Sequence, residues 1–494
     1  MKRLARWAGG IAVALVLLFA AVIVLRAFAA RRKPALKPWH HALSGEFQAR
    51  DATPSTTLAD YLAIEDRVMK ELERDVYAAP LSPEDRNAAN RYWRESPIWP
   101  GRFTPDWNRT QQLEPQGAVR GGALLIHGLT DSPYSMRAMA DIYRRHGFYV
   151  LCLRMPGHGT VPGALKRATW RDWRAAARIG VRHVRGRIGP ALPLHLVGYS
   201  NGGEIVTQYA LDTLSDASLP KVERVVLFSP MIGVTSFTGM ADLFAKAVDA
   251  FGTIPYFEKS RWLDILPEYI PFKYDSFPAF AGQQTAAATA VLQATALDAA
   301  KTGRIRSLPP ILAFVSLVDS TVQTWATVDK LFGRLTDNGS ALVLFDLNRS
   351  SVVRPFLRTD FDEQLKGLWT SPARRYRLTL VTNASPRSTE VVATTAHAGE
   401  NGIEIATLNL GWPPGIFSLS HLAVPFRPDD PLFGIDPDRS VDYGLRLGLI
   451  APRGERGILS VGADQFMRLN CNPFFPYLEK RVEEWIGESV SDKR

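Results

Sequence analysis

The chain has 494 residues, of which 46% are hydrophobic and 22% charged, a balance typical of a globular protein with one large domain or two. Its net charge of +10 would suit nucleic acid or an anionic membrane, but it has no zinc-finger spacing, RNP motif or basic tail, which excludes nucleic acid as an expected partner. The two cysteines, Cys152 and Cys471, are too few for a disulfide scaffold and lack metal-ligand spacing, although one disulfide between them remains open.

The first feature in chain order is an uncharged run over residues 7–25, rich in Val, Leu, Ile and Ala. As a helix it would be about 28 Å long, close to the hydrocarbon thickness of a bilayer. A cleaved signal peptide is the alternative, because residues 27–29 resemble an A-x-A site. The length of the run and the position of Arg26 favour an uncleaved membrane anchor over residues 1–33. Only six residues precede the run, so we expect the bulk of the chain on the periplasmic or extracytoplasmic side.

Residues 34–115 are expected to cover the main domain rather than to form its core. The proline-containing stretch 34–54 is typical of a linker. Thr57 and Asp60 have capping-box spacing, and the apolar residues after them recur at helical intervals. We therefore expect an N-terminal helix packed on the main domain, followed by irregular structure.

From residue 122 the pattern changes to alternating strands and helices. Strand-like apolar runs cover residues 123–126, 148–153, 194–197 and 222–230, with helix-like stretches at 135–145 and 169–185. Such alternation through short loops predicts a mostly parallel sheet with helices on both faces. Sites in these sheets collect at the carboxyl ends of strands, where His127, His158 and Ser200 all fall.

The stretch Gly198-Tyr199-Ser200-Asn201-Gly202 has the Gly-x-Ser-x-Gly pattern of a nucleophile elbow, in which a serine lies at a tight turn between a strand and a helix. Gly198 and Gly202 leave room for the neighbouring chain. The N-terminus of the following helix supplies unpaired N–H groups and a positive dipole end, which favour a developing oxyanion. The motif is short enough to occur by chance, so its meaning depends on the rest of the chain.

Four motifs follow one another along the chain, namely His127-Gly128-Leu129-Thr130, Pro156-Gly157-His158-Gly159, Trp170-Arg171-Asp172-Trp173 and Gly198-Tyr199-Ser200-Asn201-Gly202. Together they resemble the α/β-hydrolase fold, in the branch of monoacylglycerol lipases, serine aminopeptidases and carboxylesterases. The resemblance implies that Ser200 is a nucleophile, that the backbone N–H groups of Leu129 and Asn201 hold the oxyanion, and that His127 and His158 shape turns. It implies neither a metal nor an organic cofactor.

A serine nucleophile needs a base, and the base needs an acid to orient it. In this fold both follow the serine, with the acid first. The strand-like run 311–318 ends at Asp319, in a turn that resembles the family's acid turn. The alternative acid is Asp346, which lies within the next strand-like run.

Only His397 and His421 follow Asp319 along the chain. His421 lies in an apolar segment with a turn, and this segment resembles the family's histidine loop. His397 lies in a polar stretch that is typical of an exposed hairpin end. We therefore expect His421 to be the base. The gap between Asp319 and His421 is long for the family, and an insertion over residues 349–415, which contains two strand-like runs, would explain it.

These features predict a membrane-anchored serine hydrolase that cleaves a small-molecule or lipid carboxylic ester through an acyl-enzyme. Amide cleavage, acyl transfer and a catalytically silent binding protein on the same fold remain alternatives. A row of arginines on helix 169–185 is expected to be solvated, or alternatively to contact anionic headgroups. The expected organisation is an anchor (1–33), a linker and covering segment (34–115), a first core half (116–230), an aromatic-rich cap (231–306) and a second core half (307–494) with the insertion at 349–415.

Overall fold

The computed structural model describes residues 31–41, 43–233, 258–319, 321–350, 361–371, 374–400, 402–449 and 467–491. The predicted membrane segment, residues 7–25, lies outside the described residues, and so does the part of the predicted cap over residues 234–257. No helix within the described ranges is long and apolar enough to cross a membrane.

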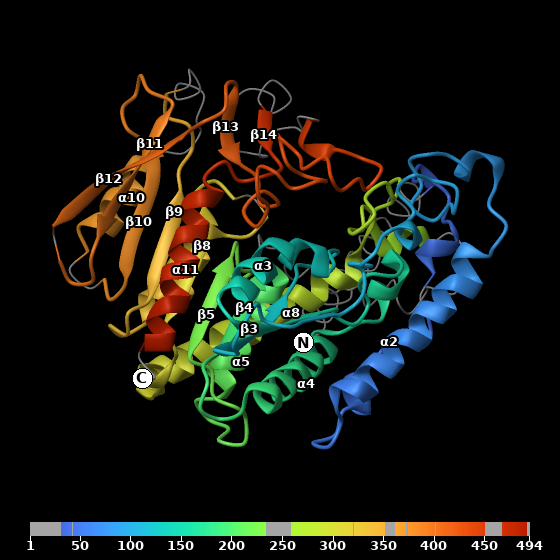
Figure 1. Ribbon diagram of the computed structural model, residues 1–494, viewed down its shortest axis with the longest axis horizontal. Helices are drawn as coiled ribbons and strands as arrows, with labels where there is room; N and C mark the ends of the chain where they lie inside the picture. Colours follow the sequence, from blue (N-terminus) through green and yellow to red (C-terminus); the bar gives the residue numbers. More distant parts are fainter. Residues whose placement is uncertain are drawn as a thin grey trace, which may run out of the picture.

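Within the described residues, a ten-stranded sheet forms the centre of the molecule (Figure 1). Its strands are β1 (Gln111–Leu113), β2 (Gly121–Ile126), β3 (Phe148–Leu153), β4 (Leu194–Tyr199), β5 (Arg224–Phe228), β8 (Ile311–Ser316), β9 (Ala341–Phe345), β10 (Arg377–Asn383), β11 (Glu390–Ala396) and β12 (Ile403–Gly411). The strands from β3 through β2, β4, β5, β8 and β9 to β10 are parallel. Antiparallel pairing adds β1 at one edge and β11 and β12 at the other.

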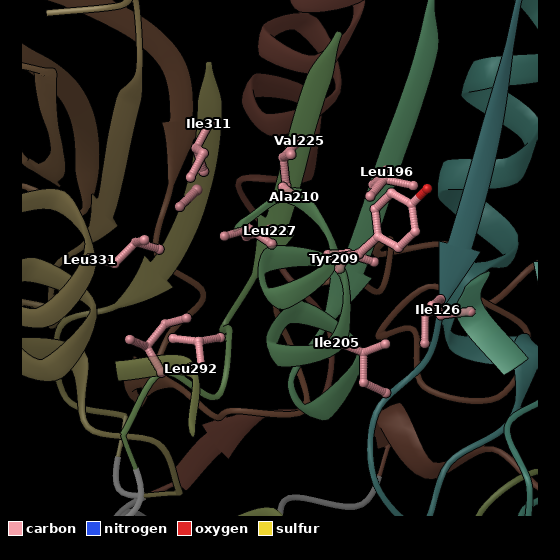
Figure 2. Close-up of a cluster of buried hydrophobic side chains, with 14 of the residues drawn as sticks. Ile126, Leu196, Ile205, Tyr209, Ala210, Val225, Leu227, Leu292, Ile311 and Leu331 are labelled. Atoms are coloured by element: carbon pink, nitrogen blue, oxygen red, sulfur yellow. The ribbon is translucent and has the colours of Figure 1, made fainter. Parts of the chain in front are cut away.

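Helices cover both faces of this sheet because successive side chains of each buried strand point to opposite faces. Leu124 and Ile126 of β2 pack in a cluster with α4, α5 and α8, part of which Figure 2 shows. Ala123 and Leu125 face α3 and α11 instead. The predicted parallel sheet with two helical layers is confirmed. The helices are α2 (Leu58–Leu72), α3 (Arg137–Arg145), α4 (Trp170–Ile188), α5 (Asn201–Asp212), α8 (Ala279–Lys301), α9 (Thr324–Ala326), α10 (Phe361–Trp369) and α11 (Phe475–Ser491).

Helix α2 starts at the predicted capping box and belongs to a covering segment that reaches the core. Thr57 Oγ1 accepts the N–H of Asp60 at 3.2 Å, and the Asp60 carboxylate accepts the N–H of Thr57 at 2.9 Å. Tyr61 on α2 donates its hydroxyl to the carbonyl of Arg154 at 2.6 Å. The buried Arg154 guanidinium also pairs with Glu46 at 2.8 Å. The segment is therefore bonded to the loop after β3, which carries one of the four motifs.

The arginine row of α4 is tied to neighbouring elements, so the expectation of a solvated row does not hold for most of it. One member, Arg182, donates to the carbonyl of Thr56 at 2.9 Å. Ion pairs take up three others, namely Arg174 with Glu204, Arg178 with Asp212 and Arg185 with Glu223. A membrane contact through this row would have to compete with these partners.

The insertion after β9 extends the sheet. Two of its strands, β10 and β11, match the predicted runs, whereas β12 was not predicted because its side chains are mostly exposed and form no apolar run. The chain then returns through β13 (Ile416–Leu419), which pairs with β14 (Met467–Leu469). Cys152 on β3 and Cys471 after β14 are both buried and free, so the alternative of a disulfide between them is wrong.

Candidate active site

Ser200 occupies a tight turn between β4 and α5. Its φ of 53° and ψ of −116° lie in a region that residues with a side chain rarely adopt. A Cβ added at Gly198 would lie 2.4 Å from the carbonyl oxygen of Gly202, and one added at Gly202 would lie 2.1 Å from that of Ile126. Because only glycine fits at both positions, the contact within the elbow and the close approach of the elbow to β2 together explain the Gly-x-Ser-x-Gly spacing.

The elbow is fixed from the neighbouring strand. The N–H of Ser200 donates to the carbonyl of Phe228 at 2.9 Å, and the N–H of Met231 donates to the carbonyl of Ser200 at 2.9 Å. Helix α5 begins at the next residue, Asn201. Its unpaired N–H groups and positive dipole end therefore lie beside the serine.

The turn after β2 lies against Ser200 and carries one of the two predicted oxyanion donors. The turn is closed by the N–H of Asp131, which donates to the carbonyl of Gly128 at 3.3 Å. A Cβ on Gly128 would lie 3.2 Å from the Cβ of Ser200, so the turn contacts the serine closely. Among the described residues, neither the N–H of Leu129 nor that of Asn201 donates a hydrogen bond. Both are thus available to a ligand oxygen.

The structure brings the predicted acid and base together. Asp319 lies three residues after the end of β8, and its Oδ2 accepts the Nδ1–H of His421 at 2.7 Å. Its Oδ1 accepts the N–H groups of Thr321 at 2.9 Å and Val322 at 3.0 Å, which orient the carboxylate. The Asp319 side chain is fully buried and that of His421 nearly so. A proton on Nδ1 leaves Nε2 of His421 as the acceptor nitrogen.

His421 also lies beside the elbow. Its ring stacks on that of Tyr199, the residue before Ser200, with 5.4 Å between centroids and 30° between planes. Within the described residues, the Ser200 hydroxyl forms no hydrogen bond with His421. Such bonds are often long in a ligand-free site and tighten when substrate binds.

The alternative acid and base lie elsewhere. Thr382 donates to the Asp346 carboxylate at 2.7 Å, and Arg349 forms an ion pair with it. His397 follows β11, which runs antiparallel to β10. It therefore lies at the amino ends of the parallel strands, whereas Ser200 lies at their carboxyl ends. There it faces Glu404 at 3.4 Å. Neither residue belongs to the site.

His127 and His158 hold loops, as predicted. The Nδ1–H of His127 donates to the carbonyl of Gly128 at 2.9 Å, while its Nε2 accepts the N–H of Met155 at 3.1 Å. The Nδ1–H of His158 donates to the carbonyl of Pro156 at 3.0 Å. Burial lowers the pKa of His127 to about 3 and also lowers the pKa of His158, so both rings are neutral near pH 7.

Sequence reasoning missed a contact between the predicted cap and the turn after β2. Residues 265–276, here called the cap strap, connect β6 (Trp262–Asp264) to β7 (Phe277–Pro278). In this strap, Lys273 donates from Nζ to Thr130 Oγ1 at 2.7 Å, and the N–H of Tyr274 donates to the Thr130 carbonyl at 2.7 Å. Lys273 and Thr130 are 143 positions apart, and no local pattern connects them.

The site thus combines a strained serine, a histidine bonded to a buried carboxylate, and two backbone N–H groups that donate no hydrogen bond among the described residues. This set is the one required for nucleophilic catalysis at a carbonyl. In the described part of the chain, no group of three or more His, Cys, Asp or Glu side chains could hold a metal ion.

Parts of this chain are similar to known proteins. A thermostable monoacylglycerol lipase from Bacillus sp. (strain H-257) is 28% identical over 214 residues, which cover 42% of this chain and 75% of the relative. The monoacylglycerol lipase of Paleococcus ferrophilus is 19% identical, with a TM-score of 0.35 over 48% of this chain and 89% of that one. A soluble variant of the Saccharomyces cerevisiae monoglyceride lipase is 17% identical, with a TM-score of 0.35 over 48% and 82%.

A family model gives the broader assignment. It matches residues 123–386, more than half of the chain, which include the elbow, the turn after β2 and Asp319. The model describes the alpha/beta hydrolase family, and the chain belongs to that family.

Proposed function

We propose that the chain is a serine hydrolase that cleaves carboxylic esters through Ser200, His421 and Asp319. The observation that carries the proposal is the 2.7 Å hydrogen bond between His421 and Asp319, made beside the strained turn that holds Ser200. A buried carboxylate bonded to Nδ1 leaves Nε2 free to take a proton. The backbone N–H groups of Leu129 and Asn201 supply the hydrogen bonds that the same reaction needs at the carbonyl oxygen.

In the proposed mechanism, Ser200 Oγ attacks the ester carbonyl while His421 Nε2 takes its proton. The N–H groups of Leu129 and Asn201 stabilise the negative oxygen of the tetrahedral intermediate. His421 then returns the proton to the leaving alcohol, and an acyl-enzyme forms on Ser200. Water, deprotonated by His421, then attacks the acyl carbonyl. The bond from this carbon to Ser200 Oγ breaks, His421 returns the proton to Oγ, and the carboxylic acid leaves. The Asp319 carboxylate orients His421 and stabilises the imidazolium in both halves of the cycle.

The test of the mechanism is covalent labelling with a fluorophosphonate, which reacts with an activated serine. Wild type should label, whereas Ser200→Ala and His421→Ala should not. His397→Ala is the matched control and should label as wild type does, because that histidine lies at the opposite edge of the sheet. An unlabelled but folded wild type would show a silent binding protein. Labelling that survives His421→Ala would refute the assignment of the base.

The substrate class needs its own experiment. The Bacillus relative is named a monoacylglycerol lipase, so we propose monoacylglycerols and other single-chain esters as the first substrates to test. A series of esters of increasing acyl length, matched with amides of the same acids, should give turnover for the esters only. Faster amide turnover would instead support a peptidase or amidase. Product formed only when an acceptor alcohol is added would support an acyltransferase.

We further propose that residues 7–25 anchor the chain in a membrane, with the hydrolase domain on the periplasmic or extracytoplasmic side. The uncharged composition and length of the run support this proposal. The full chain should sediment with membranes and resist extraction by high salt, and a chain without residues 1–33 should not sediment. N-terminal sequencing of the mature protein would refute an anchor if the protein began after residue 29, because that end would show cleavage of a signal peptide.

A further inference from the structure

The turn that carries the Leu129 N–H is itself strained. Thr130 has a φ of 63°, in the left-handed region, although it is β-branched. Valine, isoleucine and threonine are strongly disfavoured there, and such a residue persists only where its surroundings hold it. Because Leu129 directly precedes Thr130, the direction of its N–H depends on how firmly that conformation is held.

The hydroxyl and the carbonyl of Thr130 are both held by the cap strap. Lys273 Nζ bonds the hydroxyl and the N–H of Tyr274 bonds the carbonyl, each at 2.7 Å. Thr130 is only 8% exposed, so water competes little for these bonds. The hydroxyl of Tyr274 in turn accepts the N–H of Thr160 at 2.7 Å. Two consecutive strap residues therefore bridge the turn after β2 and the loop after β3.

Besides the hydrogen bonds that Glu268 accepts from Asp275 and Ser276 within the strap, the backbone of the strap is bonded to the N-terminal covering segment. Arg91 is fully buried and donates from Nη1 to the carbonyls of Ile270 and Lys273, both at 3.1 Å. Asn108 donates from Nδ2 to the carbonyl of Pro271 at 3.0 Å. Three strap carbonyls, those of Ile270, Pro271 and Lys273, are thus fixed by residues outside both the cap and the sheet.

We propose that Lys273 is a positioning residue for the oxyanion site: with the backbone of Tyr274 it clamps Thr130 in its left-handed conformation and so aims the Leu129 N–H at the substrate oxygen. The proposal rests on the proposed function, since it assigns an oxyanion to Leu129. It also explains why the cap strap and the covering segment are bonded together. In this proposal Lys273 acts on the reacting atoms through Thr130.

The first experiment removes each end of the clamp in the full chain. Lys273→Met and Thr130→Val each delete one partner of the same hydrogen bond and keep the size of the side chain. Each should lower kcat about 10-fold and leave KM within about twofold, a smaller loss than the roughly 100- to 1,000-fold seen when a whole oxyanion donor is removed. The double variant should lose no more than either single variant, because both remove one interaction.

A second variant tests strain directly. Glycine adopts a φ near 63° without strain, so Thr130→Gly needs no clamp. Adding Lys273→Met to Thr130→Gly should change kcat less than about twofold. The control is Lys166→Met, because Lys166 contacts Glu258 and the Trp262 ring elsewhere in the cap and does not touch Thr130. It should leave kcat unchanged.

Amide hydrogen exchange gives a readout that does not depend on activity. Peptides covering residues 127–132 should exchange faster in Lys273→Met than in wild type or Lys166→Met. The clamp would be refuted if Lys273→Met lowered kcat equally in the threonine and glycine backgrounds. A higher KM with unchanged kcat would also refute it. Either result would mean that Lys273 acts on the substrate or on Asp131. If wild type labels with fluorophosphonate but Lys273→Met does not alter labelling rate or exchange, the clamp alone fails. If wild type does not label, both proposals fail.

Discussion

Replacing Asp131 by asparagine should change how the stability of the protein depends on pH. Asp131 closes the turn after β2, is 3% exposed, and has no hydrogen-bond partner for its Oδ2 among the described residues. Burial raises the pKa of this carboxyl from 3.8 to about 6, although Lys273 and the N–H of Ser132 act in the opposite direction. The folded protein therefore binds this proton more tightly than the unfolded chain does.

The sign follows from linkage. A carboxyl whose pKa is raised by folding contributes stability at low pH, and this contribution is lost as the pH rises through the folded-state pKa. One pKa unit corresponds to about 1.4 kcal/mol, so the full contribution is about 3 kcal/mol, of which about 2 kcal/mol is lost between pH 4.5 and pH 7.5. The amide of an asparagine does not titrate in this range, so Asp131→Asn lacks this loss.

Urea unfolding followed by tryptophan fluorescence, at pH 4.5 and pH 7.5, measures the effect. The difference in the free energy of unfolding, wild type minus Asp131→Asn, should fall by about 2 kcal/mol from the lower to the higher pH. Asp337→Asn, at an exposed position, controls for the loss of one carboxylate. If wild type and Asp131→Asn keep a constant difference across this range, the buried carboxyl is not titrating there and the reasoning is wrong.

Three further substitutions test the elbow, the acid and the core. Gly202→Ala should destabilise the protein by at least about 2 kcal/mol in urea unfolding, because its Cβ would overlap a carbonyl oxygen at the end of β2. The control is Gly186→Ala on α4, which has open space around it and should stabilise the protein by up to about 1 kcal/mol. In an ester assay Asp319→Asn should lower kcat by about 10⁴-fold, whereas Asp346→Asn should keep activity within about tenfold of wild type. The reverse ranking would make Asp346 the catalytic acid in place of Asp319. Leu227→Ala, fully buried between the sheet and α5, should cost about 2 to 5 kcal/mol of unfolding free energy, and a cost below about 1 kcal/mol would contradict the packing described.

The core of the fold could be predicted because its signals are local. The parallel strands are buried on both faces and therefore appear as short, largely apolar runs, interrupted in β4 only by His195. The glycines at 198 and 202 are required by contacts within the elbow and with the adjacent strand, so the motif carries its own geometry. Asp319 was found by the same logic, because it follows the end of a predicted strand.

What could not be predicted depends on contacts between distant segments. Strand β12 lies at the edge of the sheet with mostly exposed side chains, and Ile405 is 70% exposed. Its apolar residues alternate with polar ones only over the short stretches 403–405 and 408–410, and it has none of the continuous apolar runs that marked the buried strands. The bond from Lys273 to Thr130 connects two stretches whose sequences show no shared pattern. A threonine with a positive φ gives no sign of it in the sequence, because the conformation is imposed by the strap rather than by the turn residues.

The long gap between Asp319 and His421 is reconciled by where the insertion starts and ends. Asn348, just after β9, donates its backbone N–H to the carbonyl of Phe417 at 2.6 Å and its side-chain amide to the carbonyl of Ile416 at 2.8 Å. The chain therefore returns to the point from which it left, after the strands β10 to β12 have extended the sheet past β9 (Figure 1). Ser316, at the end of β8, then donates to the carbonyl of Leu419 at 3.2 Å. This bond places the ends of β8 and β13 side by side. Asp319 and His421, which are 102 positions apart, therefore come within hydrogen-bond distance despite the insertion between them.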